Sequence, residues 1–272
     1  MSLLLPLLLA AAPAPLAPPS GYRLVWRDEF ARAGLPDGRR WSYDTDFNRR
    51  GWHNEEKQYY SARRRKNARV AGGRLIVEAH AERLDPRRFP DWGSQAYSSA
   101  RLVTRGKARW TYGFFEVRAK LPCATGSWPA IWTLADTPAR KWPDDGEIDI
   151  MEHVGFDPEV VHHSVHTAAF NHVKGTHRTG TSRVAGACGA FRNYQLLWTA
   201  QTIRMGVDGR ELFRFDRPAG AGKAEWPFDA PQYLILNVAV GGAWGGQKGI
   251  DAKAFPARME VDYVRVWQAP QR

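Results

Sequence analysis

Alternation of apolar and polar residues is the feature that most limits the folds open to this chain. The segment 74–81 puts Leu75, Val77 and Ala79 on one face of an extended strand, and the segment 114–121 repeats the pattern. A period of two is typical of half-buried strands. No segment of helical length shows a convincing period of 3.6. The chain is therefore expected to be all-β.

Turn signals separate these strands. Segments 202–207 and 210–215 flank Asp208-Gly209, which predicts a hairpin with a type I′ turn. The segment 233–240 is nearly all apolar and predicts a central strand, and 259–267 predicts another strand. Many short strands divided by such turns favour a β-sandwich or jelly roll of two stacked antiparallel sheets. We expect one such domain over residues 21–272.

The N-terminal residues 1–20 differ from the rest. The apolar run 3–12 has the length of a signal-peptide core and is too short to span a bilayer. No Lys or Arg precedes the run, and prolines crowd the cleavage region, so the signal is atypical. We expect an export signal followed by a Pro/Ala linker over 13–20 without structure of its own. The protein is then expected to be secreted or periplasmic.

The net charge limits the kinds of binding partner to expect, and the cysteine count limits the disulfide and metal sites. The net charge is +11, yet the one tight basic run, 63–66, has no nucleic-acid motif beside it and is expected to be a solvated loop. We expect no nucleic-acid partner, no membrane span and a monomer. The 12 tryptophans indicate a large core and a stacking platform. Cys123 and Cys188 make neither a disulfide framework nor a zinc site, and whether they pair stays open.

The segment 146–153 carries three carboxylates. Glu147 and Asp149 alternate with isoleucines, which predicts a strand with an acidic and an apolar face. Glu152 lies five positions after Glu147, an odd separation that would turn its side chain into the core. An unpaired buried charge costs several kcal/mol. We therefore predict a β-bulge near Ile150-Met151 that returns Glu152 to the acidic face.

Carboxylates on one face predict a specific chemistry. Retaining glycosidases use two carboxyl groups about 5–5.5 Å apart, one as nucleophile and one as acid/base. Asp149 would hydrogen-bond one glutamate, and neighbouring negative charge would raise the pKa of the other. The spacing does not say which glutamate has which role. A calcium site or a solvated acidic edge strand is the alternative interpretation.

The motif from Glu147 to Glu152, Glu-Ile-Asp-Ile-Met-Glu, resembles the signature of the laminarinase-like enzymes of glycoside hydrolase family 16. The extra Met resembles the bulged subgroup of that family. The resemblance runs from about Tyr22 to Gln268. Further matching segments are 28–30, 54–60, 97–102, 112–120, 126–132, 165–167, 236–242 and 261–267.

This resemblance implies roles for the three carboxylates. Glu147 would be the nucleophile, Glu152 the acid/base and Asp149 the supporting carboxylate. The implied fold is a jelly roll with the sugar bound in a cleft on the concave sheet. The implied reaction cleaves internal β-1,3-glucosidic bonds with retention, through a glycosyl-enzyme intermediate, and needs no catalytic cofactor.

Other residues become candidates for substrate binding. The resemblance implies that the tryptophans of 128–132 line the subsites next to the cleavage point and that His166 bonds a sugar hydroxyl. A tryptophan among glycines is well placed for a cleft rim. Plain core packing is the alternative for each tryptophan, and a zinc site is the alternative for the histidines. The substrate-binding candidates are Asn54, Arg101, Trp128, Trp132, His166 and Trp244.

A structural Ca²⁺ on the convex side is common in the family. The matching positions here are Glu29, the backbone carbonyl around Gly73, and Asp262. Three oxygen donors would need water to complete six to eight ligands. The alternative is that no metal binds.

The leading function is therefore a secreted endo-acting β-1,3-glucanase. The same fold acting on mixed-linkage β-glucan or a sulfated galactan is one alternative, and a transglycosylase is another. A non-catalytic β-glucan-binding module is the alternative from a different class. Such relatives have lost the acidic pair, whereas Glu147 and Glu152 are both present.

Overall fold

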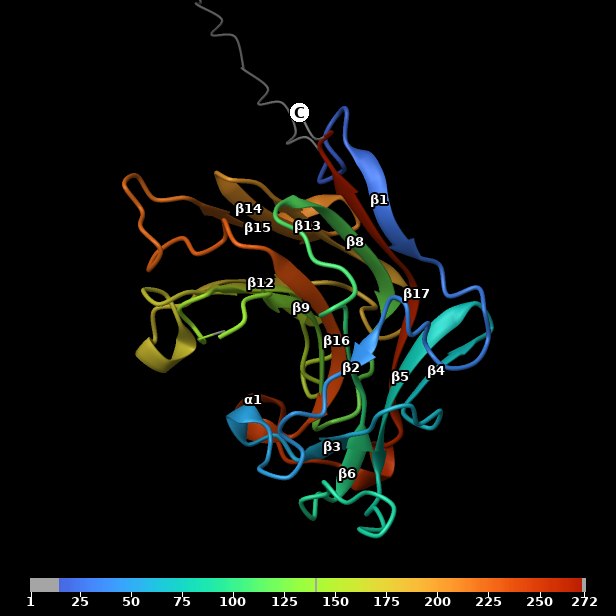
Figure 1. Ribbon diagram of the computed structural model, residues 1–272. Helices are drawn as coiled ribbons and strands as arrows, with labels where there is room; N and C mark the ends of the chain where they lie inside the picture. Colours follow the sequence, from blue (N-terminus) through green and yellow to red (C-terminus); the bar gives the residue numbers. More distant parts are fainter. Residues whose placement is uncertain (1–14, 140, 271–272) are drawn as a thin grey trace, which may run out of the picture.

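Two stacked β-sheets make up the protein in the computed structural model, which describes residues 15–139 and 141–270 (Figure 1). The larger sheet has ten strands and the smaller has seven. The larger sheet contains β1 (Arg23–Asp28), β3 (Gln58–Tyr60), β4 (Ala68–Ala71), β5 (Arg74–Ala81), β6 (Tyr97–Ser99), β8 (Gly113–Lys120), β13 (Arg192–Trp198), β14 (Thr202–Val207), β15 (Arg210–Asp216) and β17 (Ala257–Gln268). The smaller contains β2 (Ser42–Tyr43), β7 (Arg101–Val103), β9 (Ser127–Ala135), β10 (Glu147–Glu152), β11 (Val160–His166), β12 (Arg178–Arg183) and β16 (Gln232–Val240).

Strand order follows a jelly-roll arrangement. The larger sheet runs β15-β14-β13-β8-β17-β5-β6-β3, with β1 paired to β17 and β4 to β5. The smaller runs β12-β11-β10-β9-β16-β7-β2. Among the described strands every pairing is antiparallel except that of β3 with β6. The predicted all-β sandwich of two antiparallel sheets is confirmed.

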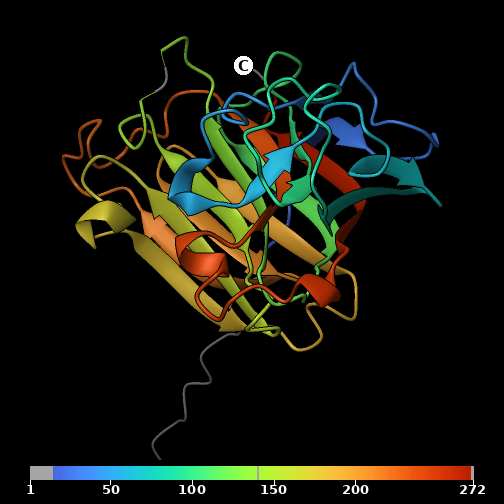
Figure 2. The same cartoon turned by 90° about the horizontal axis from the view of Figure 1, so that it is seen from below.

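Short helices connect the strands. They are η1 (His53–Glu55), η2 (His172–Lys174), α1 (Gly242–Gly245) and η3 (Ala252–Ala254). Seen from below, α1 and η1 lie in front of the strands of the smaller sheet (Figure 2). Within the described ranges, no helix is long and apolar enough to cross a membrane.

The core lies between the two sheets. Along β16 all nine residues are buried, because β9 and β7 flank this strand on its two sides. The predicted central position of this strand is confirmed. Asp208 and Gly209, at the tip of the β14–β15 hairpin, have φ values of 51° and 81°. Two successive positive φ values are what a type I′ turn requires, as predicted.

The predicted bulge lies in β10. Asp149 pairs with Trp132 of β9 and the next pair is Met151 with Ile131, so Ile150 is the extra residue. On the other side, three steps of β10 match two steps of β11 between Asp149 and Glu152. Isoleucine and methionine side chains before and after the bulge are fully buried in the core. The acidic side chains consequently share the opposite face, as the sequence predicted.

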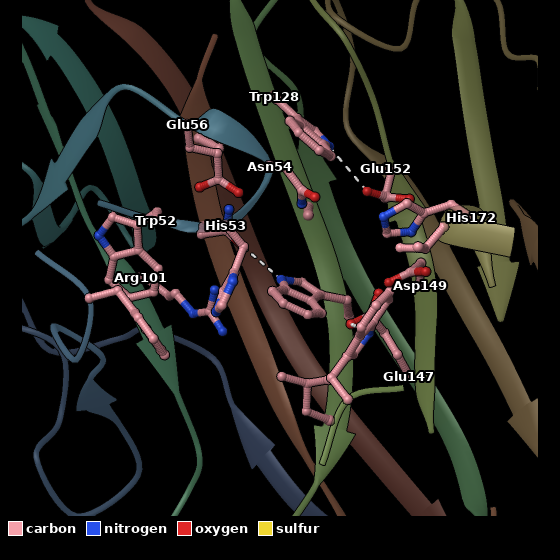
Figure 3. Close-up of a pocket in the computed structure, with 18 residues that line it drawn as sticks. Trp52, His53, Asn54, Glu56, Arg101, Trp128, Glu147, Asp149, Glu152 and His172 are labelled. Carbon is pink, nitrogen blue, oxygen red and sulfur yellow. Dashed lines mark hydrogen bonds between the residues drawn. The ribbon is translucent and has the colours of Figure 1, made fainter. Parts of the chain in front are cut away.

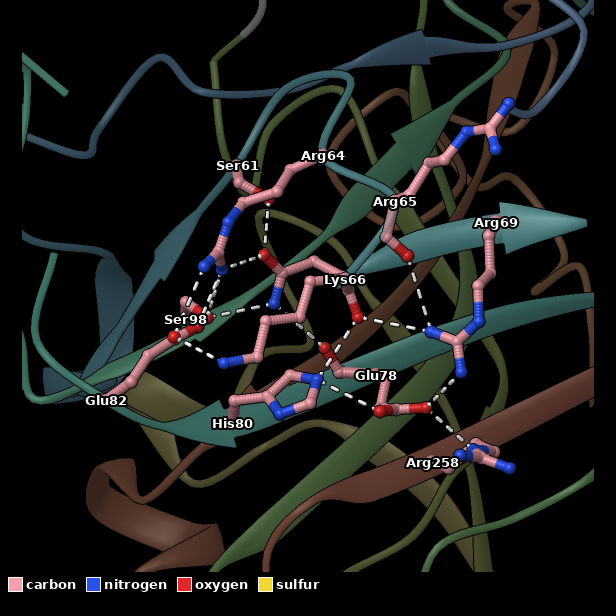
Figure 4. A network of polar contacts seen from close by, with 11 residues as sticks. Ser61, Arg64, Arg65, Lys66, Arg69, Glu78, His80, Glu82, Ser98 and Arg258 are labelled. Carbon is pink, nitrogen blue, oxygen red and sulfur yellow. Dashed lines mark hydrogen bonds and ion pairs between the residues drawn. The ribbon is translucent and has the colours of Figure 1, made fainter. Parts of the chain in front are cut away.

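The basic run of residues 63–66 is less free than expected. Arg64 and Lys66 both pair with Glu82, at 2.6 Å each (Figure 4). A second acidic centre nearby is Glu78, which Arg69 and Arg258 contact. Although burial raises the pKa of Glu78, hydrogen bonds from His80, Arg69 and Arg258 lower it to about 2. Two of the basic side chains, Arg69 and Arg258, therefore link β4 and β17 to Glu78 of β5 through ion pairs.

The segment before β1 differs from its prediction. Leu16 is 1% exposed and packs against Phe114 and Leu197, and its N–H donates to the Gly209 carbonyl at 2.6 Å. The prediction of a structureless linker over 13–20 is therefore wrong at Leu16, because its apolar side chain packs against two buried residues of the larger sheet. The apolar run 3–12 of the predicted export signal lies outside the described residues.

The cysteine question left open by the sequence has an answer. Cys123 and Cys188 form a disulfide with a Cα–Cα distance of 5.8 Å, within the normal range. It joins the loop after β8 to the loop between β12 and β13. His153, the residue after Glu152, places Nε2 3.5 Å from Cys123 Sγ and Nδ1 2.9 Å from the Val160 carbonyl. The bond therefore lies next to the end of the carboxylate strand.

Candidate active site

A cleft of about 390 Å³ lies on the face of the smaller sheet that is turned away from the core (Figure 3). Alternation along the strands produces it, since Ile131, Ile148 and Val238 face the core while their neighbours face outward. The lining residues are Phe47, Trp52, His53, Asn54, Glu56, Arg101, Trp128, Ala130, Trp132, Leu134, Trp142, Glu147, Asp149, Glu152, His172, Val173, Asn237 and Ala239. The cleft thus combines aromatic walls with a strip of carboxylates.

Glu147, Asp149 and Glu152 all reach this cleft from β10. Burial raises the pKa of each, and for Glu147 the charge of Asp149 adds to the effect. For Asp149, the charge of Glu152 adds likewise. Mutual repulsion makes full ionisation of the three costly, so the cluster retains protons that isolated carboxyl groups would lose. A site with both protonated and ionised carboxyl groups can supply a nucleophile and an acid.

Two neighbours favour the ionised form of Glu147. Trp142 Nε1 donates to Glu147 Oε2 at 3.0 Å, and this lowers the pKa of that carboxyl against the larger effect of burial. His166 Nε2 lies 3.3 Å from Asp149 Oδ2 and 3.9 Å from Glu147 Oε1. His166 itself is 5% exposed and contacts the carboxylates from the neighbouring strand β11, where it pairs with Glu147. Its predicted place beside the cleft is found, although it does not line the open space.

The two predicted tryptophans of β9 line the cleft through different contacts. Trp128 Nε1 donates to Glu152 Oε1 at 3.1 Å. Trp132 Nε1 donates to Asn237 Oδ1 at 2.7 Å. These bonds orient the Trp128 indole toward the carboxylate strand β10 and the Trp132 indole toward β16, on the opposite side of β9.

Arg101 and Asn54 also line the cleft, as predicted. The Arg101 guanidinium lies over the rings of Trp52 and Trp132, at 5.0 and 4.7 Å, and its Nε is 3.1 Å from Asp44. Such cation–π contacts hold a charged side chain flat against aromatic walls. Asn54 occupies the left-handed region with φ 56°, which Asn tolerates better than most residues.

Comparison with protein-family models identifies the family of this chain. The family model described as "Glycosyl hydrolases family 16" matches residues 55–265. The chain belongs to glycosyl hydrolase family 16. It is therefore a glycoside hydrolase, and the predicted family is confirmed.

Relatives of this family 16 chain agree with that assignment. A protein named beta-glucanase from Rhodothermus marinus is 52% identical over 254 residues, which cover 91% of this chain and 85% of that protein. The solved structure of SCLam, described as a non-specific endo-β-1,3(4)-glucanase, matches with a TM-score of 0.90 and 52% identity, covering 95% of this chain and 96% of that one. The structure of the laminarinase from Rhodothermus marinus gives a TM-score of 0.85 and 51% identity, covering 92% and 98%.

One predicted substrate-binding residue of the family 16 site has a different position. Trp244 does not line the cleft; its ring packs edge-on against Trp128, with centroids 5.3 Å apart, and against His162 at 4.7 Å. Close packing of Gly245 against the Trp128 side chain brings this helix in, since a β-carbon there would come within 2.9 Å of Trp128. Trp244 therefore contacts Trp128 beside the cleft, and its predicted contact with the substrate stays a prediction.

Sequence reasoning missed several cleft residues. Trp142 lies in the loop before β10, five residues ahead of Glu147, and is 40% exposed at the cleft. Glu56 lies inside the matching segment 54–60, and no pattern in that segment assigns it a role. A tryptophan directly before the acidic strand was the available signal for Trp142; His172, by contrast, comes from η2, where no periodic pattern marks it.

Both carboxylates among the predicted calcium ligands Glu29, Gly73 and Asp262 are paired with arginines. Glu29 makes a bidentate pair with Arg265, both contacts being 2.9 Å. Asp262 bonds Arg118 at 2.6 Å, on the side of the neighbouring strand β8. A cation beside two guanidinium groups would meet repulsion. These carboxylates therefore do not fit Ca²⁺ without first releasing their arginines.

Proposed function

We propose that this chain is an endo-acting, retaining β-1,3-glucanase. The observation that carries the proposal is the bulged strand β10, which brings Glu147, Asp149 and Glu152 to one face of a cleft with aromatic walls. The names of the similar proteins, a beta-glucanase, a laminarinase and an endo-β-1,3(4)-glucanase, support a β-glucan substrate.

We assign the carboxylates the roles that the resemblance to the family 16 motif implies. Glu147, which accepts a hydrogen bond from Trp142, attacks the anomeric carbon as the nucleophile. Glu152 donates its proton to the departing glycosidic oxygen, and the sugar stays bound to Glu147 as an ester. Glu152, now ionised, removes a proton from water, which attacks the same carbon and releases the sugar with retention. Asp149 lies between the two glutamates in sequence. When it is ionised, its charge raises the pKa of Glu147 beyond the effect of burial and opposes simultaneous ionisation of the cluster.

Sugar release and product stereochemistry test this proposal. Reducing ends should form from laminarin faster than from lichenan, and agarose should not be cleaved. The first products, followed by NMR, should keep the β-anomer. Release from agarose or carrageenan but not from laminarin would favour the galactanase alternative, and binding without cleavage would favour the non-catalytic module.

Two substitutions test the roles. Glu147→Ala should abolish turnover without unfolding the protein, and azide should restore cleavage with inverted products. Glu152→Ala should slow laminarin cleavage by about 10²–10⁴-fold and affect an activated aryl glycoside much less, because that leaving group needs no proton. Near-normal laminarin turnover by Glu152→Ala would contradict its role as acid.

Export and calcium are separate proposals. The apolar run 3–12 supports secretion or periplasmic location, which a fractionation of expressing cells would test. Structural Ca²⁺ at Glu29, Gly73 and Asp262 would have to displace the two arginine pairs. A rise in the unfolding temperature with Ca²⁺, reversed by a chelator, would support it, and no response would contradict it.

A further inference from the structure

Glu56 is a half-buried carboxylate in the cleft that the hydrolytic steps do not use. It lies outside the β10 cluster, in the segment between η1 and β3, and lines the same cavity. Figure 3 shows its carboxylate pointing toward the middle of the cleft, between Trp128 and the Trp52–Arg101 pair. A carboxylate at such a place needs either a partner in the protein or a ligand.

The backbone around Glu56 is held firmly. Glu56 forms a β-bridge with Gly241, and the N–H of the next residue, Lys57, donates to the Val240 carbonyl at 2.8 Å. A β-carbon on Gly242 would meet Glu56 Cγ and Trp128 Cζ3, each at 3.4 Å, and the Asn54 carbonyl at 2.8 Å. Glu56 and Trp128 therefore flank one glycine backbone, and the carboxylate has a fixed position beside an indole wall.

Protein partners satisfy only one oxygen of this carboxylate. Gln58 Nε2 donates to Oε2 at 2.7 Å, and the Tyr60 hydroxyl lies 3.5 Å from the same oxygen. Among the described residues no hydrogen bond ends on Oε1, and Oε1 is not among the buried atoms without a partner. The second oxygen is accordingly open to the cleft and free to accept hydrogen bonds.

A chain of hydrogen bonds connects Glu56 to a cleft wall. Trp132 donates to Asn237, Asn237 Nδ2 donates to the Tyr60 hydroxyl at 3.0 Å, and that hydroxyl faces Glu56 Oε2. Because each member orients the next, the open oxygen and the Trp132 ring keep a constant relation to each other. A ring face and a fixed acceptor together can position a pyranose, through stacking and through its hydroxyls.

We propose that Glu56 is a substrate-binding residue whose open Oε1 accepts hydrogen bonds from hydroxyls of an uncharged β-glucan. The same charge, added to those of the β10 cluster, disfavours sulfated or carboxylated polysaccharides in the cleft despite the net charge of +11. This inference rests on the proposed function and adds a reason for a neutral substrate.

The ionisation of Glu56 gives the inference a pH signature. Burial raises its pKa to about 7, against the hydrogen bond from Gln58 and the positive charge of Arg101. The other titratable groups that face it are Tyr60 of β3 and Glu152 of β10. Because sugar hydroxyls donate to the ionised form, glucan affinity should fall as the pH is lowered through about 7.

Binding in an inactive background tests the inference. Calorimetry would measure the affinity of a laminarin oligosaccharide for Glu147→Gln and for Glu147→Gln with Glu56→Gln. Glutamine keeps the size of the side chain but cannot offer a charged acceptor, so we expect the dissociation constant to rise about tenfold at pH 8. The second variant should also lose the pH dependence around 7. The exposed neighbour Glu55, changed to Gln in the same background, is the matched control and should bind like the parent.

Other outcomes are decisive as well. If Glu56→Gln binds as tightly as the parent and keeps its unfolding temperature, Glu56 is structural and the inference fails, while laminarin hydrolysis by the wild-type protein leaves the proposed function intact. If the parent binds no uncharged β-glucan, both fail. If the active Glu56→Gln enzyme shows a raised KM with an unchanged kcat, the substrate-binding role is supported by a second readout.

Discussion

Trp128 Nε1 donates a hydrogen bond of 3.1 Å to Glu152 Oε1, so one residue of the cleft wall also holds the proposed acid. The bond comes from β9 and reaches across to β10, two strands whose register the bulge sets. Trp128 is predicted only as a sugar-stacking surface, but its hydrogen bond also lowers the pKa of Glu152 against the larger effect of burial.

Replacing Trp128 by Phe separates the two roles. The ring is kept but the N–H is lost, and that N–H lowers the pKa of Glu152. The basic limb of the kcat profile should therefore move to higher pH, with a loss of up to about tenfold in kcat/KM. Trp132→Phe is the control: its N–H bonds Asn237 instead, so it should raise KM without moving the limb. A limb unchanged in Trp128→Phe would contradict the coupling.

The carboxylate cluster should destabilise the folded protein at high pH. Glu147 has a raised pKa because of burial and the charge of Asp149, so the folded state holds its proton more tightly than the unfolded state. Stability from such a group is present below its ordinary pKa and is lost as pH rises through the raised value. Glu147→Gln should therefore raise the unfolding temperature at pH 8 and change it little at pH 4.

A control with the opposite sign exists at Asp37. A side-chain hydrogen bond from Arg39 lowers the pKa of Asp37 to about 2. Asp37→Asn should accordingly lose a little stability at pH 8, and only a little because the pair is exposed to solvent. Lower stability of Glu147→Gln than of the wild type at pH 8 would refute the prediction.

Leu16 should contribute measurably to stability. Truncation of a fully buried leucine to alanine typically costs about 2–5 kcal/mol, and Leu16→Ala should fall at the lower end because its segment is short. Activity should not change, since Leu16 packs on the larger sheet and the cleft lies on the smaller. Leu24→Ala, at a residue 41% exposed, is the matched control and should stay within about 0.5 kcal/mol in urea unfolding. Equal stabilities would show that Leu16 does not hold the segment in solution.

The disulfide should stabilise the folded protein by lowering the conformational entropy of the unfolded chain. Its sequence separation of 65 corresponds to at most about 4 kcal/mol of lost chain entropy in the unfolded state. Cys123→Ala with Cys188→Ala should therefore unfold at lower denaturant, and a reductant should shift the wild type toward the variant while leaving the variant unchanged. If complete reduction leaves the unfolding midpoint of the wild type unchanged, the disulfide does not make this contribution.

Residues in strands were the predictable part of the molecule. Periodicity of two predicts β5 and β8, and a nearly continuous apolar run predicts β16. The high cost of a buried charge predicts the bulge from the odd spacing of Glu147 and Glu152. Both arguments need only local geometry and the rule that charges stay out of an apolar core. The three carboxylates could be assigned to one face for the same reason.

Loop residues escaped prediction because their positions depend on distant contacts. Leu16 is buried only because Phe114 and Leu197, far along the chain, leave room for it. Trp244 supports Trp128 because Gly245 allows a close approach. Burial raises the pKa of Glu56, and the residues next to it in sequence do not predict that burial. Such relations follow from the assembled fold and not from a local pattern.

The bond between Cys123 and Cys188 encloses β9, β10, β11 and β12 in one covalent ring, with Glu147, Asp149 and Glu152 inside it. A protease that cuts the backbone once within the ring, for example after Lys141 in the exposed turn before β10, leaves both pieces tethered by sulfur. In denaturing gel electrophoresis the cut molecule would migrate as a single species until its disulfide is reduced.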